Sequence, residues 1–348
     1  MDVPLLMSSV RHDILLDRLL ILHDAMRQAF LDRMADSRRA DVCDVEREAE
    51  SDTVYGLDAA ADELVLEHLE AFARETGQAV RFLAEGIADR GLVIPAGVSS
   101  ADVVWRILMD PLDGTRELMV QKRPAWILTA VAREVPHGAR LQDAVLAVQT
   151  EVPLKKQHLA DQVWAVRGKG VTARRWSRLD GRSVSLDVRP TRSKTLSHGF
   201  AAISRFFPGA RDELAALDDE LMAAVLGPVE AGRARVFEDQ YLSTGGQLYG
   251  LMSGQDRFLA DLRPLMAPLL ARRGEEAGIS CHPYDLCTVL IAEELGVVVR
   301  HPSGRPLDLP MDCTTPVAWV GYANSAIRDL VEPHLIHILR RRGHLRRS

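Results

Sequence analysis

Apolar side chains recur at helical spacing in two segments near the N-terminus. The first, residues 12–35, carries a stripe formed by Ile14, Leu15, Leu19, Leu22, Met26 and Phe30. The second runs from residue 59 to about residue 74, and its apolar side is formed by Leu64, Leu66, Leu69 and Phe72. Because residues three or four apart lie on one face of a helix, both segments are predicted to be amphipathic helices.

Shorter apolar and β-branched runs predict strands in the next part of the chain. They cover residues 80–84, 103–109, 125–135 and 143–149. The first run ends at Glu85, and the second, flanked by Asp102 and Asp110, has the composition of a buried strand. The segment 86–101 is rich in glycine, proline and serine, so we predict a loop there.

The second half of the chain alternates between helical and strand patterns. We predict helices at 241–254 and 285–295, and strands at 256–261 and 297–300. Helices alternating with strands indicate a mixed α/β architecture. A length of 348 residues, at about 150 residues per domain, suggests two lobes. We expect an N-terminal lobe of residues 1–200 and a C-terminal lobe of residues 201–348.

Composition and charge narrow the function classes. Hydrophobic residues make up 47% and charged residues 26%, as in ordinary globular proteins, and the net charge of −6 argues against a nucleic-acid partner. No apolar run approaches the ~20 residues that span a bilayer, and acidic residues interrupt the N-terminal apolar stretches, so we expect neither a membrane segment nor a signal peptide. The four cysteines include no Cys-x-x-Cys pair and indicate reduced thiols in a cytoplasmic protein. The arginines between Arg340 and Arg347 are interpreted as a solvated basic end.

The strongest chemical signal is the segment Asp110-Pro111-Leu112-Asp113-Gly114-Thr115. A buried strand delivers Asp110, and Pro111 and Gly114 favour a tight turn that brings Asp113 back beside it. Two neighbouring carboxylates repel each other unless a proton or a cation lies between them, and Mg²⁺ prefers such oxygen ligands. If a helix begins after Asp113, the first backbone N–H groups favour an anion next to the metal. The segment therefore predicts adjoining metal and phosphate sites, because a plain Asp-rich turn would bury two carboxylates at a cost.

Haloacid dehalogenase-like phosphatases carry a related Asp-x-Asp-Gly-Thr motif, in which the first aspartate attacks phosphorus. Here two residues separate Asp110 from Asp113, and the position two before Asp113 is Pro111. This spacing argues against a covalent aspartyl phosphate at the motif.

Three separated segments together resemble the inositol monophosphatase and fructose-1,6-bisphosphatase superfamily of metal-dependent phosphatases, which includes bisphosphate nucleotidases. They are the strand end Phe82-Leu83-Ala84-Glu85, the segment Asp110 to Thr115, and Pro283-Tyr284-Asp285 with the helix that runs to Gly296. Weaker matches are Asp58 and the segment Leu259-Ala260-Asp261-Leu262. The resemblance spans about residues 58–310. It implies the superfamily's layered α/β/α/β/α sandwich, usually a homodimer, with the aspartate-rich motif in the N-terminal lobe and Asp285 and the substrate loops in the C-terminal lobe.

The resemblance implies a role for each matched position. Mg²⁺, in two or three copies and with Mn²⁺ as a substitute, is implied at Glu85, Asp110, the Leu112 carbonyl, Asp113 and Asp285. Thr115, together with Asp58 and Glu85, is implied to orient or deprotonate the attacking water. Substrate and phosphate contacts are implied at Gly114, Thr115, Arg116, Glu276 and Asp285. From the residues alone, Asp58 and Asp285 also fit helix N-cap positions, and Glu85 fits a loop carboxylate.

Three features depart from the family pattern. Gly86 stands where a second glutamate is common, and Tyr284 stands where the family has tryptophan. The tripeptide after Thr115, residues 116–118, is closer to the bisphosphate nucleotidase pattern. Nearby, Lys122 and Arg123 fit either a second phosphate site or a solvated face.

The sequence thus predicts a Mg²⁺-dependent phosphomonoesterase that hydrolyses a small phosphorylated metabolite, an inositol phosphate or a sugar phosphate, with a metal-activated water. Two alternatives stay open. One is a 3′(2′),5′-bisphosphate nucleotidase, and the other is a catalytically degenerate relative that binds a ligand or acts as a scaffold.

Overall fold

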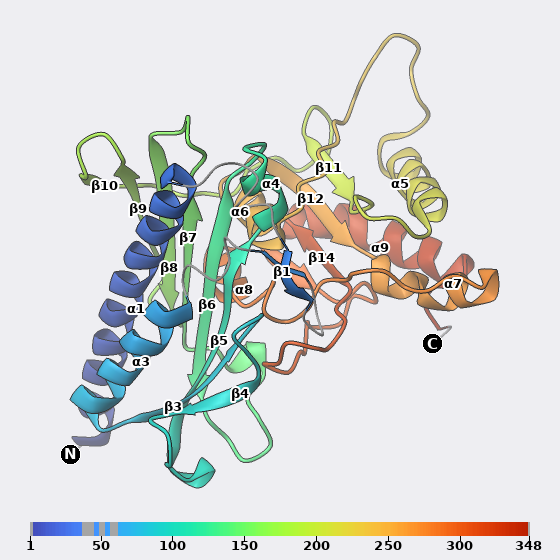
Figure 1. The fold of residues 1–348 in the computed structure, drawn as a ribbon. Helices are drawn as coiled ribbons and strands as arrows, with labels where there is room; N and C mark the ends of the chain where they lie inside the picture. The colour runs from blue at the N-terminus through green and yellow to red at the C-terminus, as the bar shows by residue number, and fades with distance from the viewer. Residues whose placement is uncertain (1–2, 37–44, 49–52, 56–61, 347–348) are drawn as a thin grey trace. The chain divides into compact units, whose positions relative to one another are not determined.

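The computed structural model describes residues 3–36, 45–48, 53–55 and 62–346. The chain divides into two compact units (Figure 1). The first unit contains residues 1–186, 283–291 and 310–314, and the second contains residues 187–282, 292–309 and 315–348. The late segment with Asp285 therefore groups with the first unit, although it follows most of the second unit in sequence.

An eight-stranded sheet forms the centre of the first unit, with the strand order β10-β9-β8-β7-β6-β5-β3-β4. Its strands are β3 (Ala79–Ala84), β4 (Ala88–Ile94), β5 (Val103–Asp113), β6 (Ala125–Arg133), β7 (Leu146–Val152), β8 (Leu159–Val166), β9 (Val171–Ser177) and β10 (Ser183–Ser185). Neighbouring strands are antiparallel except β3 and β5, which are parallel. A separate antiparallel pair is formed by β1 (Val45–Glu48) and β2 (Thr53–Tyr55).

Helices α1 (Val3–Asp36) and α3 (Asp62–Thr76) cover one face of this sheet (Figure 1). The predicted stripe of α1 is buried against the strands from Leu15 to Phe30, whereas Ile14 is exposed. The same face carries His23, which is fully buried, and its two ring nitrogens each lie 2.9 Å from a hydroxyl, of Thr129 and Thr150. These contacts satisfy the buried histidine and fix the helix against β6 and β7. Shorter helices of this part of the chain are α4 (Thr115–Met119) and the 3₁₀ turns Ser100–Asp102 and Leu141–Asp143.

Buried polar side chains also lie on the opposite face of the sheet, toward its β8 and β9 side. Glu151 accepts hydrogen bonds from the Gln157 side chain at 2.7 Å and from the backbone N–H of Asp161 at 2.9 Å. The Asp161 carboxylate in turn accepts two bonds from the Arg175 guanidinium, at 2.6 and 2.8 Å. Each buried oxygen in this row is therefore matched by a donor, as burial requires.

The second unit is built on a four-stranded sheet with the order β11-β12-β14-β13. Its strands are β11 (Phe200–Ile203), β12 (Asp256–Asp261), β13 (Val298–Arg300) and β14 (Trp319–Tyr322), and its helices are α5 (Arg211–Leu226), α6 (Thr244–Met252), α7 (Ala267–Arg273), preceded by the 3₁₀ turn Arg263–Met266, and α9 (Ser325–Arg341). Helix α8 (Val289–Glu294) begins in the first unit and ends in the second. Helices α5 and α9 share one apolar core with the sheet. On the other face α6 packs so closely that a Cβ on Gly321 would lie 2.5 Å from Leu251.

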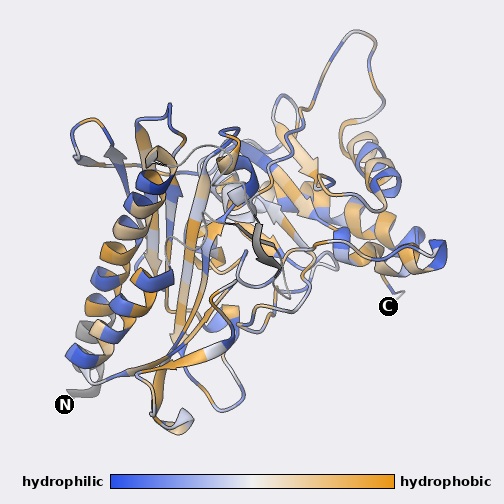
Figure 2. Cartoon of the chain, viewed as in Figure 1, coloured by the Kyte–Doolittle hydropathy of each residue, from blue (hydrophilic) through white to orange (hydrophobic). Residues whose placement is uncertain are grey.

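Hydrophobic residues gather on the strands of both sheets, and the helices carry both kinds of residue (Figure 2). Among the described residues, no helix is at once long enough and apolar enough to cross a bilayer.

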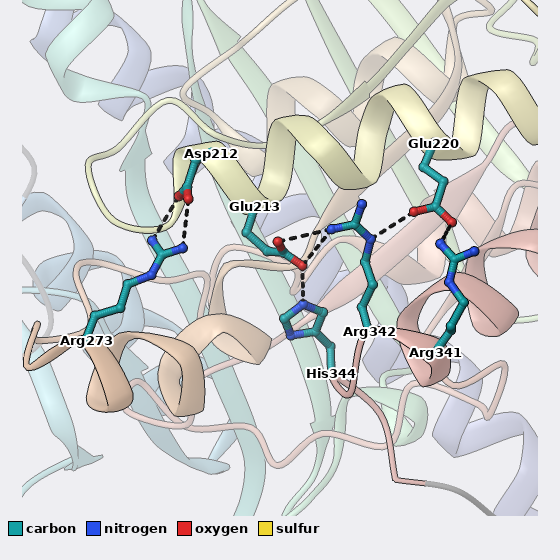
Figure 3. Close-up of polar contacts among 7 residues, drawn as sticks. All are labelled: Asp212, Glu213, Glu220, Arg273, Arg341, Arg342 and His344. Carbon is teal, nitrogen blue, oxygen red and sulfur yellow. Dashed lines mark hydrogen bonds and ion pairs between the residues drawn. The ribbon is translucent and has the colours of Figure 1, made fainter.

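Ion pairs tie α5 to the C-terminal end of the chain (Figure 3). The Arg342 guanidinium donates to Glu213 at 3.1 Å and to Glu220 at 2.9 Å, and Arg341 also pairs with Glu220. The His344 ring lies 2.7 Å from Glu213. The interpretation of the basic end as merely solvated is therefore wrong for Arg342, which is half-buried between two glutamates.

Several predicted elements differ from the structure. The strand predicted at 103–109 continues as β5 through Pro111 to Asp113, so the turn expected from Pro111 and Gly114 comes only after Asp113. The segment 86–101, predicted to be a loop, contains β4, which pairs with β3 at the edge of the sheet. Its residues alternate between half-buried and exposed and include a glycine, which is why their composition resembled a loop. The helix predicted at 285–295 begins only at Val289, because residues 283–288 form successive turns. By contrast, the strand predicted at 256–261 has the observed bounds.

Candidate metal centre

Strand β5 carries the two aspartates of the motif on one face of the sheet. Asp110 pairs with Leu128 of β6, and Asp113 pairs with Trp126. Three steps along β5 thus match two steps along β6, so β5 contains one extra residue. In a regular strand, residues three apart point to opposite faces, and the extra residue brings both carboxylates to the same face. Pro111, which cannot donate to the ladder, lies within this irregularity.

The backbone after Asp113 turns sharply into α4. Gly114 caps this helix with a φ of 96°, a left-handed conformation that glycine adopts without strain. The Thr115 hydroxyl donates to the Leu112 carbonyl at 2.7 Å, and the Leu112 N–H donates to the Asp110 carboxylate at 3.0 Å. A helix does begin after Asp113, and these two hydrogen bonds fix the side chains of the motif to its backbone.

Asp285 joins this pair from the late segment of the first unit. One carboxylate oxygen from each of Asp110, Asp113 and Asp285 lies within 4.8 Å of the others. Asp110 and Asp113 are buried, and Asp285 is half-buried. Because α8 begins at Val289, Asp285 does not occupy its N-cap position. Three oxygen ligands at this spacing suit a hard divalent cation such as Mg²⁺.

Glu85 lies at the end of β3, beside the end of the parallel strand β5. The ladder pairs Ala84 with Met109, and the Glu85 N–H points to the Met109 carbonyl at 3.4 Å. Parallel neighbours place the residues that follow them side by side, so Glu85 stands next to Asp110. Its carboxylate accepts a hydrogen bond of 3.1 Å from the Tyr284 hydroxyl.

The charges of this group act strongly on one another. Burial, reinforced by the charges of Glu85, Asp113 and Asp285, raises the pKa of Asp110 well above its usual value, although the Leu112 N–H opposes the shift. Burial and the same aspartates also raise the pKa of the Cys287 thiol, so this cysteine stays neutral. A buried cluster of like charges is the condition under which a cation is held, and the donor set fits Mg²⁺ or Mn²⁺.

The other predicted site residues lie in different surroundings. Asp58 lies outside the described residues. Arg116 is half-buried on α4, and Glu276 is exposed in the second unit. The structure thus gathers Glu85, Asp110, the Leu112 carbonyl, Asp113, Thr115 and Asp285 within the first unit.

Two features of the site were not foreseen from the sequence. The Tyr284 hydroxyl reaches Glu85, although the sequence marked Tyr284 only as a departure from tryptophan. Gly86 has a φ of 71°, and its N–H donates to the Asp89 carboxylate at 3.0 Å. A glycine between a strand and a second short run is a signal for such a turn. Nothing in the sequence indicated the hydroxyl contact.

Solved structures match this chain, whereas no protein-family model and no curated protein matches its sequence. Fructose-1,6-bisphosphatase of Leishmania major superposes with a TM-score of 0.66 at 12% identity, over 93% of this chain and 94% of that one. The suhB protein of Bartonella henselae gives 0.60 at 15% identity, over 92% and 98%. An IMPase of Thermotoga maritima gives 0.57 at 16% identity, over 94% and 99%.

These matched proteins together form the inositol monophosphatase and fructose-1,6-bisphosphatase superfamily. The predicted resemblance and the predicted fold class are therefore confirmed. The chain has the inositol monophosphatase-like fold.

Proposed function

We propose that the protein is a Mg²⁺-dependent phosphomonoesterase that acts on a small phosphorylated metabolite. The convergence of Asp110, Asp113 and Asp285, with ligand oxygens within 4.8 Å of one another, is the observation that supports this most. Support also comes from fold neighbours that are named for phosphate-ester hydrolysis, a fructose-1,6-bisphosphatase and an IMPase.

In this proposal the metal ions are two or three Mg²⁺, with Mn²⁺ as a substitute, and the groups that hold them are Glu85, Asp110, the Leu112 carbonyl, Asp113 and Asp285. Mg²⁺ supplies neutralisation of the phosphate charge and makes water a better nucleophile. Asp110 and Asp113 are also buried away from bulk water, which strengthens each charge interaction in the site.

The remaining residues handle the water and the substrate. Thr115 uses its proton in the bond to the Leu112 carbonyl, so its oxygen keeps acceptor capacity to orient a water. Glu85, with Asp58, takes the proton of that water. Gly114, Arg116 and Asp285 contact the substrate.

Attack by water, and not by an aspartate, follows from the surroundings of the two motif carboxylates. Asp110 accepts the Leu112 N–H, and both aspartates belong to the cluster that would hold a cation. A single turnover in ¹⁸O-water should therefore place the label in released phosphate. Label in Asp110 or Asp113 would establish a covalent phosphoenzyme instead.

An inositol phosphate or a sugar phosphate is the leading substrate class. A bisphosphate nucleotide would need cations for a second phosphate, and the candidates were Lys122 and Arg123. Both lie near the buried carboxylate of Glu117, at 3.2 Å and 3.7 Å, so their charge is partly used there. This contact favours the phosphomonoesterase over the 3′(2′),5′-bisphosphate nucleotidase.

The test is a screen of phosphorylated metabolites with released phosphate as the readout. We expect turnover in Mg²⁺ or Mn²⁺, none in EDTA, and none with Asp110→Asn. Asp161→Asn is the matched control, because Asp161 is buried in the same sheet but pairs with Arg175. Full activity in EDTA or with Asp110→Asn would overturn the metal-dependent mechanism at this site. Inactivity on every ester with intact metal binding would favour the scaffold alternative. Light scattering of the purified chain tests the homodimer, and cell fractionation tests the cytoplasmic location.

A further inference from the structure

The late segment of the first unit is tied to the rest of that unit on both sides of Asp285. On one side the Tyr284 hydroxyl donates to Glu85 at 3.1 Å, across 199 positions of sequence. On the other side the Thr288 hydroxyl donates to Gln149 of β7 at 2.9 Å. Thr288 and Gln149 are fully buried, and Tyr284 is 3% exposed. The backbone that carries Asp285 is therefore fixed between two hydrogen bonds, one partly buried and one fully buried.

Glu85 needs such a contact more than the aspartates of the site do. It is half-buried and has one more rotatable bond than an aspartate, so it loses more rotamer freedom when it is held as a ligand. Asp110 is fixed by the Leu112 N–H, whereas Glu85 follows the last residue of β3 and precedes the left-handed Gly86. A hydroxyl bond to one carboxylate oxygen restricts its rotamers and leaves lone pairs for a cation.

The chemistry of the contact also suits a positioning role. A phenol O–H that donates to a carboxylate forms a charge-assisted hydrogen bond, which is stronger than a bond between neutral groups. Hydrogen bonds of this kind to metal ligands typically change metal affinity 10–100-fold when they are removed. The ring of Tyr284 is held by burial and does not depend on the bond, so phenylalanine would fit in its place.

We propose that Tyr284 is a positioning residue for the metal centre, and that its hydroxyl holds the Glu85 carboxylate in the geometry that binds the cation. This inference rests on the proposed function, because it assigns Glu85 as a ligand. It also gives a specific role to Tyr284, which stands where the inositol monophosphatase family has tryptophan.

The test measures Mn²⁺ binding to the whole protein without substrate, by electron paramagnetic resonance of free Mn²⁺. Tyr284→Phe should raise the Kd by about tenfold. Tyr322→Phe is the control, because it removes the hydroxyl of another buried tyrosine, which lies in the second unit. The Kd of this control should stay within twofold of the unmodified protein. A double-mutant cycle then introduces Tyr284→Phe, and separately Tyr322→Phe, into the Glu85→Ala variant. In that background the loss of the Tyr284 hydroxyl should have almost no effect on the Kd.

The outcomes separate this inference from the proposed function. If the unmodified protein binds Mn²⁺ and Tyr284→Phe binds it equally well, the positioning role is refuted and the phosphatase proposal stands. An equal loss in the presence and absence of Glu85 would show a general structural effect and would also refute the role. If the unmodified protein binds no divalent cation, the proposed function fails, and this inference fails with it. Circular dichroism melting of Tyr284→Phe checks that the variant is folded.

Discussion

Replacing Asp110 by asparagine should change stability in opposite directions with and without Mg²⁺. Asparagine keeps the size of the side chain and an oxygen for the Leu112 N–H at 3.0 Å, so the substitution mainly removes a charge. The carboxylate is 1% exposed, and its neighbours Asp113 and Asp285 place oxygens within 4.8 Å. At an effective dielectric constant of about 20, two unit charges at this distance repel each other by about 3.5 kcal/mol.

Protonation relieves part of this repulsion, because burial and the neighbouring carboxylates raise the pKa of Asp110 well above its usual value. We therefore expect the metal-free variant to be more stable than the unmodified protein by about 1–3 kcal/mol. In excess Mg²⁺ the order reverses, because a cation present at about 1,000 times its Kd stabilises the unmodified protein by about 4.1 kcal/mol. The variant loses most of that gain.

Thermal unfolding at pH 8, followed by circular dichroism in EDTA and in Mg²⁺, measures both effects. One kcal/mol corresponds to roughly 2–4 °C in Tm for units of this size. The difference in Tm between the variant and the unmodified protein should therefore change by several degrees between the two buffers. Asp161→Asn, which loses its pairing with Arg175, should lower Tm equally in both buffers. A lower Tm for Asp110→Asn in EDTA, or no effect of Mg²⁺ on the unmodified protein, would refute a cation site at this cluster.

Three further predictions concern other positions. Gly86→Glu adds the charge that is common in the family, but it also strains a backbone with a φ of 71°, so the matched control is Gly86→Gln. The glutamate variant should bind Mn²⁺ about fivefold more tightly than the glutamine variant. Equal Kd values would exclude an effect of charge at this position. Burial raises the pKa of Glu151 to about 7, and the charge of Asp161 acts in the same direction. Hydrogen bonds from Gln157 and from the Asp161 N–H, together with the charge of Arg175, oppose this shift. Between the unfolded pKa of about 4.5 and the folded pKa of about 7, the folded state binds a proton that the unfolded state has lost. The stabilisation that comes from this proton is complete below about pH 4.5 and is lost as the pH rises through about 7. Urea unfolding should show this fall, and Glu151→Gln should remove it. Arg342→Met should lower the free energy of unfolding in urea by about 1 kcal/mol, whereas Arg346→Met, at an exposed position, should not change it.

The parts of the fold and of the site that local sequence encodes could be predicted. The apolar run before Asp110 specifies a buried strand, and Gly114 specifies a turn directly after Asp113. Helix α1 is visible in the same way, because its stripe repeats at the helical period. These signals do not depend on which distant segment packs against them.

Contacts between distant segments could not be predicted from the sequence alone. The bond from Tyr284 to Glu85 joins positions 199 residues apart, and no local pattern records it. The pairing of Arg342 with α5 was missed because a run of arginines is usually a solvated end. The edge strand β4 was missed because half-buried, mixed residues give a weak alternation. In each case tertiary packing decided the outcome over local propensity.

The grouping of residues 283–291 with the first unit has a consequence for synthesis of the chain. Asp285 follows Asp110 by 175 positions, the difference between their numbers, yet both belong to one carboxylate cluster. At about 5–20 residues per second, the ribosome reaches Asp285 roughly 10–35 s after Asp110. During that interval the nascent chain carries the earlier aspartates without their third partner, and with less charge to retain a divalent cation. In the proposed function, tight metal capture is thus a late event of biogenesis, open only to chains that have been translated through most of their length.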